Sequence, residues 1–349
     1  MLFHSYVFLS ALPSGPSRRL ARLGLALLTA AGLAFTPPAP PKAPRVRTFT
    51  LRCQATVPVP PAGTHALDLW VPVPHNDPSQ TVADLQVESP VPYKIERGAF
   101  GNTMLHLRLP AMPTAPLVLR FTARVSRREH LNFPAGQPGK SRPAPADPDQ
   151  ARWLAPDRLV PLDPQIRQQA REVVEQAGAK TDLDQARAIY QHVVGTMTYD
   201  KSGQGWGRGD IYYACDVRRG NCTDFHALFI GYCRALGIPA RFSIGLPLPA
   251  GRGKGEIKGY HCWAEFFTPQ TGWVPIDASE AAKDPARRDY FFGAHDENRV
   301  EFSRGRDLTL TPAQAGPPLN YFVFPYAEAD GKPLEVERVY EFEDLAVAP

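Results

Sequence analysis

Residues 220–229 read Gly-Asn-Cys-Thr-Asp-Phe-His-Ala-Leu-Phe. The apolar residues from Phe225 onward recur at helical spacing up to Leu236, and Gly237 ends that pattern. The sequence therefore predicts a buried helix with Cys222 at its N-terminus. The free N–H groups and the dipole of a helix N-terminus favour negative charge, so this position lowers the pKa of a thiol.

Two predicted strands lie downstream of this helix. Residues 259–267 contain His261, and residues 272–276 end just before Asp277, with a plausible hairpin turn between the strands. Because a hairpin brings its two strands together, we expect the imidazole and the carboxylate to be neighbours. A cysteine nucleophile needs an imidazole base and a group that orients the ring. The sequence predicts Cys222, His261 and Asp277 in these three roles.

Alternatives remain open for each role. Cys262 is a rival nucleophile, although its place next to His261 on a strand predicts that its side chain points to the opposite face. His226, one turn after Cys222, is a rival base. A zinc site built from Cys215, Cys222, His226 and His261 is a further hypothesis, but the Cys-x-x-Cys spacing of structural zinc sites is absent. A Cys215–Cys222 disulfide would mask the nucleophile until it was reduced.

Residues 46–130 predict an antiparallel β-sandwich-like domain or a small barrel. Prolines and glycines separate short stretches of strand-forming residues, and no cluster of chemically reactive side chains occurs there. Residues 131–152 are crowded with Pro, Gly and Asp and predict a linker. The expected strands are 46–57, 66–73, 81–87, 93–95, 103–109 and 117–125.

The second half of the chain changes to helical periodicity. Asp163 caps a predicted helix whose first residue is Pro164, and Thr181 with Asp184 forms a capping-box pattern for a second helix. We expect further strands at 240–244, 305–308 and 320–325, the last two closing against the sheet of the same domain. Residues 153–349 therefore predict one mixed α and β domain with C-terminal strands.

The N-terminus has the pattern of a secretory signal. Arg18, Arg19 and Arg22 precede an apolar run of 13 residues, 23–35, which is shorter than the roughly 20 residues that span a bilayer. We therefore expect residues 1–36 to be a signal peptide, with an N-terminal anchor as the alternative, and residues 37–45 to be a proline-rich linker. The expected location is periplasmic or extracellular.

The net charge and the number of cysteines give little information about binding partners. Removal of the three N-terminal arginines lowers the formal net charge from +4 to about +1, so the net charge indicates neither nucleic acid nor anionic lipid as a partner. We expect no nucleic-acid partner and no membrane span beyond the N-terminal segment. The chain has 5 cysteines, an odd number. In an exported protein at least one thiol should then stay unpaired or pair outside the chain.

Four motifs in this order resemble the core of the transglutaminase-like superfamily. They are Arg-Gly-Asn-Cys-Thr-Asp (219–224), Ala-Leu-Gly-Ile-Pro-Ala-Arg (235–241), His-Cys-Trp-Ala-Glu (261–265) and Trp-Val-Pro-Ile-Asp-Ala-Ser (273–279). The resemblance covers about residues 160 to 325. It implies an α+β, papain-like fold with Cys222 as nucleophile, His261 as base and Asp277 as the orienting residue. It also implies no metal cofactor at the site.

The resemblance implies a cysteine-dependent acyl-transfer enzyme that acts on protein or peptide amides through a thioester. We expect hydrolysis slightly more than cross-linking, because water reaches an exposed thioester at far higher concentration than any amine. The alternative is a non-catalytic binding or scaffold protein with the same fold. Trp206, Trp263 and Tyr260 are candidates for walls of the cleft, and Asp224 for a helix cap or a contact with Arg241.

Overall fold

The structure of the protein, a computed structural model, describes residues 43–109, 113–133 and 150–346. The predicted signal segment 1–36 lies outside the described residues, as does most of the segment expected to link the two domains. Among the described residues, no helix is both long enough and apolar enough to span a bilayer.

The first sheet is built around β1 (Val46–Val57), whose side chains alternate between buried and exposed as a half-buried strand requires. Phe49 and Leu51 are fully buried, whereas Arg52 between Leu51 and Cys53 is exposed. The other strands are β3 (Gln80–Glu88), β6 (Leu117–Arg128), β11 (Lys254–Glu256) and β18 (Glu337–Asp344). Their order is β11-β18-β1-β6-β3, and all neighbours are antiparallel.

The second sheet contains β2 (Leu67–Val73), β4 (Lys94–Arg97), β5 (Thr103–Leu109), β16 (Tyr326–Ala329) and β17 (Lys332–Leu334). Its order is β17-β16-β2-β5-β4, again antiparallel throughout. A short 3₁₀ helix, η1 (Ala99–Gly101), connects β4 to β5. Apolar side chains from both sheets belong to one hydrophobic cluster. The antiparallel sheets predicted for this half of the chain are confirmed.

The C-terminal strands differ from our expectation. β16 pairs with β2, and β18 pairs with β1, where Phe342 lies opposite Leu51. Residues 305–308 and 320–325 form no strand, so the expectation that they close against the core sheet is wrong. Gly305 and Asp307 adopt left-handed backbone conformations, with φ of 81° and 51°, which interrupt an extended chain.

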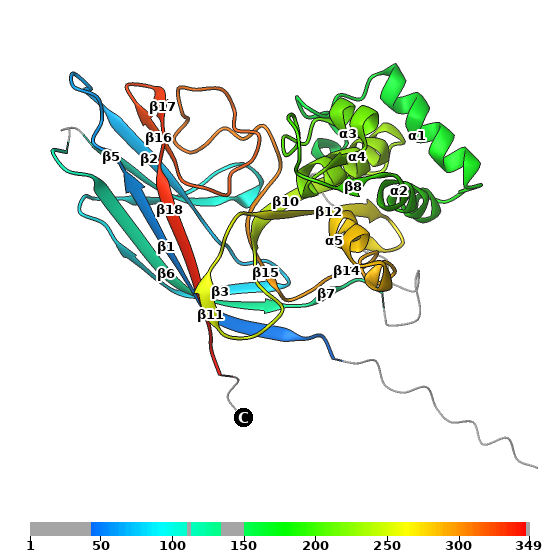
Figure 1. Cartoon of the computed structure of the whole chain (residues 1–349), viewed down its shortest axis with the longest axis horizontal. Coiled ribbons are helices and arrows are strands. Elements are labelled where there is room, and N and C mark those ends of the chain that lie inside the picture. Colours follow the sequence, from blue (N-terminus) through cyan, green and yellow to red (C-terminus); the bar gives the residue numbers. More distant parts are fainter. Residues whose placement is uncertain (1–42, 110–112, 134–149, 347–349) are drawn as a thin grey trace, which may run out of the picture. The chain divides into compact units, whose positions relative to one another are not determined.

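The core sheet has the order β13-β12-β10-β15, with bounds β10 (Ala240–Pro247), β12 (His261–Thr268), β13 (Gly272–Ile276) and β15 (Arg299–Arg304). Five helices accompany it: α1 (Pro164–Gln176), α2 (Asp182–Thr196), α3 (Ile211–Val217), α4 (Cys222–Ala235) and α5 (Ala278–Lys283). Every residue of α4 is buried. It packs on β12 and is contacted by the other four helices (Figure 1).

The predicted caps are present. The Asp163 side chain accepts a hydrogen bond from the Ile166 N–H, and Thr181 forms a capping box with Asp184. The remaining elements are short: the antiparallel pair β7 (His130–Leu131) and β14 (Ala294–His295), the parallel pair β8 (Thr198–Tyr199) and β9 (Arg219–Gly220), and the 3₁₀ helices η2 (Gln150–Leu154) and η3 (Pro285–Arg287).

Candidate active site

Cys222 is the first residue of α4, and a capping box fixes the start of that helix. The Asn221 side chain accepts from the Thr223 N–H at 2.9 Å, and the Asp224 carboxylate accepts from the Asn221 N–H at 2.9 Å. The cap places the thiol at the positive end of the helix dipole. Cys222 is 1% exposed.

His261 and Asp277 lie together, as the hairpin predicted. The first residue of β12 is His261, and β13 ends one residue before Asp277. The Nε2 atom of His261 lies 2.7 Å from Oδ2 of Asp277. The other carboxylate oxygen, Oδ1, accepts from the Glu280 N–H at 3.0 Å and so caps α5. Asp277 thus holds the imidazole through one oxygen and is itself held by a helix through the other.

The thiol of Cys222 and the imidazole of His261 shift each other's pKa in opposite directions. Burial raises the pKa of Cys222, but hydrogen bonds with Cys262 and His261 and the charge of His261 bring it well below the ordinary value of 9.0. Burial lowers the pKa of His261, yet the charge and hydrogen bond of Asp277 raise it to about 10. At neutral pH these opposite shifts favour a thiolate beside an imidazolium.

Asp277 has a third partner that the sequence did not indicate. The Nη1 atom of Arg299, from β15, lies 2.9 Å from Oδ2, the oxygen that also contacts His261. Arg299 also pairs with Asp296 at 3.1 Å, and its guanidinium lies over the Trp263 ring. Burial raises the pKa of Asp277, but His261 and Arg299 bring it well below the ordinary value. No local motif marks Arg299, because its role depends on the pairing of β15 with β10.

His226, the rival base, has both ring nitrogens engaged elsewhere. Nδ1 lies 2.7 Å from the Cys222 carbonyl oxygen, and Nε2 accepts from the Ala278 N–H at 3.2 Å. A ring that donates through Nδ1 and accepts through Nε2 is neutral. Burial is the largest influence on His226 and lowers its pKa. His226 therefore joins the start of α4 to the start of α5 and is not placed to take the thiol proton.

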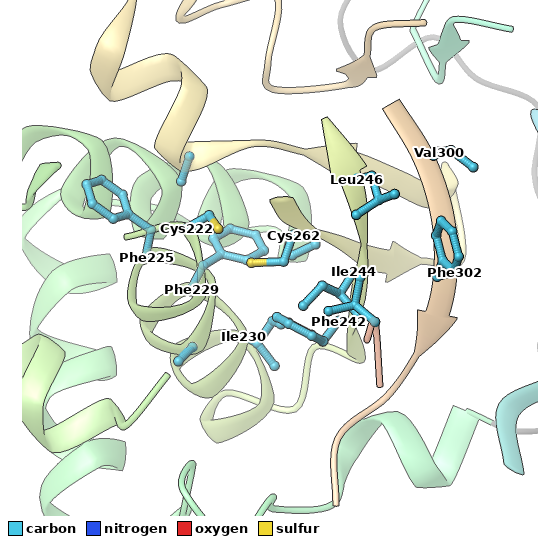
Figure 2. Packing of buried hydrophobic residues seen from close by; sticks show 14 of the residues in the cluster. Cys222, Phe225, Phe229, Ile230, Phe242, Ile244, Leu246, Cys262, Val300 and Phe302 are labelled. Carbon is cyan, nitrogen blue, oxygen red and sulfur yellow. The ribbon is translucent and has the colours of Figure 1, made fainter. Parts of the chain in front are cut away.

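Cys262, the rival nucleophile, also contacts the site. Its sulfur lies 3.6 Å from Nδ1 of His226, the nitrogen that also contacts the Cys222 carbonyl oxygen. Burial, the bond to Cys222 and the charge of Cys222 all raise the pKa of Cys262 well above 9.0. Figure 2 shows both sulfurs between α4 and β12. The strand-face argument compared Cys262 only with His261, and it did not predict that the Cys262 side chain would point toward Cys222.

Asp224 binds residues 203–209, which we call the glycine-rich loop, to the start of α4 by hydrogen bonds. Its two carboxylate oxygens accept from the N–H groups of Gly207 at 2.7 Å and Gly209 at 3.0 Å. Asp224 also accepts from the Asn221 N–H and so caps α4, which confirms one of the two expectations for this residue. The other expectation, a contact with Arg241, is wrong, because Arg241 pairs with Glu265 at 2.6 Å.

Three aromatic residues were candidates for walls of the cleft, and they lie in different surroundings. The Tyr260 hydroxyl accepts from Nδ2 of Asn221 at 2.9 Å, beside Cys222. Trp263 is 1% exposed and borders a cavity of about 130 Å³ whose other lining residues include Arg241, Glu265 and Arg304. Trp206 is half-buried in the glycine-rich loop.

The cysteines are free thiols, and all of them lie in the described residues. The Cys215 sulfur lies 3.6 Å from the Tyr232 hydroxyl, so the Cys215–Cys222 disulfide is not formed in this structure. Within residues 43–109, 113–133 and 150–346, no group of three or more His, Cys, Asp or Glu side chains is arranged to hold a metal ion. The hypothetical zinc site of Cys215, Cys222, His226 and His261 is therefore not formed in the described residues.

A comparison with known protein families identifies the domain that contains these residues. Residues 167–278 match the model of the transglutaminase-like superfamily. The chain contains a transglutaminase-like domain. The match begins in α1 and ends just after Asp277, so it includes Cys222 and His261 as well.

One sequence relative and one solved structure extend the comparison. An uncharacterized protein of Haemophilus influenzae is 33% identical over 192 residues, which are 46% of this chain and 52% of the relative. The chain thus matches about half the length of that relative. A candidate cysteine protease of Cytophaga hutchinsonii, solved as a crystal structure, is 17% identical with a TM-score of 0.56 and covers 87% of this chain and 93% of that one.

The fold likeness to the Cytophaga protein extends beyond the matched domain, and the α+β, transglutaminase-like fold is confirmed. The periplasmic domain of TgpA from Pseudomonas aeruginosa is 16% identical and covers 69% of this chain and 90% of that one. Its TM-score of 0.38 is too low to establish a shared overall fold.

Proposed function

We propose that the protein is an exported cysteine-dependent acyl-transfer enzyme that acts on amide bonds of proteins or peptides. The observation that carries this proposal is the contact between His261 and Asp277, in which Nε2 lies 2.7 Å from Oδ2. His261 in turn lowers the pKa of the Cys222 thiol at the start of α4. The transglutaminase-like domain supports it. The apolar N-terminal run of 13 residues supports export.

The reaction begins with attack of the Cys222 thiolate on an amide carbonyl. Because Nε2 of His261 is held by Asp277, the other ring nitrogen, Nδ1, faces the thiol and carries the proton that passes to the leaving amine. Backbone N–H groups at the start of α4 stabilise the oxyanion. A thioester on Cys222 remains and is released by a second nucleophile.

Hydrolysis is favoured over cross-linking in this proposal. Water reaches the thioester at a far higher concentration than any amine, unless a binding site raises the local amine concentration. Cys222 is 1% exposed and His261 is 6% exposed. A substrate therefore reaches the sulfur only after neighbouring side chains move.

Two assays test the proposal on the chain without residues 1–36. Iodoacetamide labelling at pH 7, mapped by peptide mass, should modify Cys222 first, and Cys222→Ala should remove the fast labelling. Cys215→Ala is the matched control, because Cys215 is half-buried and contacts Tyr232. Labelled casein and dansylcadaverine then distinguish hydrolysis from amine incorporation. If Cys222→Ala and Cys215→Ala label alike, the assignment of the nucleophile is wrong.

A further inference from the structure

The thiol of Cys222 has a second thiol near it, that of Cys262 (Figure 2). The side chain of Cys262, on β12, points toward Cys222 at the start of α4 (Figure 2). Its sulfur lies 3.6 Å from Nδ1 of His226, and the same nitrogen lies 2.7 Å from the Cys222 carbonyl oxygen. Figure 2 shows their sulfurs close together in the interior between the helix and the sheet. Cys262 is fully buried. In the acyl transfer proposed above, this second thiol forms no bond to the substrate, although it contributes to the low pKa of Cys222.

The two thiols have unequal chemistry. The pKa of Cys222 lies well below the ordinary value, for the reasons given above, whereas burial first and then Cys222 itself raise the pKa of Cys262. A thiolate reacts with peroxides, and a neutral thiol nearby condenses with the sulfenic acid that results. The pair thus combines an oxidisable sulfur with a resolving one.

The other cysteines have different surroundings. The Cys215 sulfur contacts the Tyr232 hydroxyl at 3.6 Å, and Cys53 is buried in β1. Cys233 is fully buried in α4, and burial raises its pKa. Cys262 is therefore the cysteine whose side chain points toward Cys222 (Figure 2).

We propose that Cys222 and Cys262 form a reversible disulfide when a peroxide oxidises the protein. The Cys222 thiolate attacks one peroxide oxygen, the O–O bond breaks, and the leaving oxygen departs as hydroxide or alkoxide. The Cys262 sulfur then attacks the sulfenic sulfur, the S–O bond breaks, and the hydroxyl leaves with the Cys262 proton as water. Cys222 and Cys262 are oxidised by two electrons in total, and the peroxide is reduced by two.

The consequence for activity rests on the proposed function. A disulfide at Cys222 occupies the sulfur that attacks the amide, so the oxidised enzyme is inactive until a thiol reduces it. The disulfide also stops oxidation at a reversible stage, because a sulfenic acid without a resolving thiol proceeds to the irreversible sulfinic acid. Cys262 is thus a modification site that protects the nucleophile.

The experiment treats the protein without residues 1–36 with a small excess of hydrogen peroxide, blocks free thiols with iodoacetamide at pH 7 and maps peptides with and without dithiothreitol. We expect a Cys222–Cys262 cross-linked peptide in the wild type that disappears on reduction. In Cys262→Ala the expected product is Cys222 sulfinic acid, which dithiothreitol does not reverse. Cys215→Ala should behave as the wild type.

Three results would overturn the proposal. One is a wild-type Cys222 oxidised to sulfinic acid as readily as in Cys262→Ala. A second is a cross-link from Cys222 to Cys215, and a third is a pair of thiols that stays reduced. Failure of the proposed function is separate, because it would show as slow iodoacetamide labelling of Cys222 in protein never exposed to peroxide.

Discussion

His261 and Arg299 contact the same carboxylate oxygen. Nε2 of His261 and Nη1 of Arg299 lie 2.7 Å and 2.9 Å from Oδ2 of Asp277, and all three side chains are buried. One oxygen between two cations stays ionised, and its position is fixed from two directions. Arg299 is thus a positioning residue for Asp277, and acts on His261 only through it.

Arg299→Met should therefore raise the pKa of Asp277 and loosen the imidazole. Breaking a buried ion pair costs about 3–5 kcal/mol of folding free energy, which urea unfolding would measure. Arg287→Met is the matched control, because Arg287 also binds Asp296, at 3.1 Å, but is partly exposed. We expect Arg287→Met to cost less than about 1 kcal/mol.

The readout that separates positioning from simple structural support is the pH profile. In Arg299→Met the acid side of the Cys222 labelling profile should move to higher pH, since protonation of Asp277 removes the charge that holds His261 as a cation. Folded Arg299→Met protein with an unchanged profile would show that Arg299 only supports the fold.

The shifted pKa values of the thiol and imidazole predict a broad plateau. The pKa of Cys222 is below 9.0, so labelling should already be fast at neutral pH and should fall only as acid protonates the thiolate. The pKa of His261 is raised to about 10, so amide turnover, which needs the protonated ring, should fall as the pH rises through about 10. Stopped-flow labelling and casein assays from pH 4 to 11 would measure both limbs.

His261→Ala tests the cause of that plateau. Without the hydrogen bond and the charge of His261, burial dominates and the pKa of Cys222 rises. The midpoint of labelling should then move upward by more than one pH unit. His226→Ala is no matched control, because His226 contacts the Cys222 carbonyl oxygen; His192→Ala, on α2, serves instead. A midpoint that stays in place in His261→Ala would remove His261 as the partner of the thiol.

Gly220 is predicted to be essential for the start of α4. Its φ is +155°, and a Cβ there would lie 2.2 Å from Oδ2 of Asp224, within the capping box. Gly220→Ala should therefore displace the Asp224 side chain and cost several kcal/mol. Gly178→Ala is the control, because Gly178 also has a positive φ, +63°, but a Cβ added there would have no atom within 4 Å; we expect that variant to lose about 1–2 kcal/mol. Thermal unfolding of both variants would compare them, and equal losses would contradict the role of the cap.

The parts of the site that the sequence predicted depend on local signals. The cap and helical period before and after Cys222 predict α4, and a four-residue turn predicts the hairpin that joins His261 to Asp277. Arg299 and the proximity of Cys262 to Cys222 could not be predicted in this way. Each depends on which strand pairs with which and on how α4 lies on the sheet, and neither leaves a mark in the spacing of nearby residues.

The C-terminal strand gives the same lesson for the fold. Alternation of buried and exposed side chains identifies a strand but not its partner, because every strand with one buried face has the same period of two residues. Residues 337–344 alternate, with Tyr340 and Phe342 buried and Val339 exposed. Only their pairing with β1 shows that they complete the first sheet.

This pairing predicts that Phe342 stabilises the N-terminal sheets although it lies almost 300 residues from their first strand, opposite Leu51. Phe342 is 3% exposed and packs under the guanidinium of Arg47. Phe342→Ala should lower the free energy of unfolding by about 3–5 kcal/mol, measured in urea. Val339→Ala, on the same strand but 42% exposed, should cost under about 0.5 kcal/mol. A Phe342→Ala variant as stable as Val339→Ala would mean that β18 does not pair with β1 in solution.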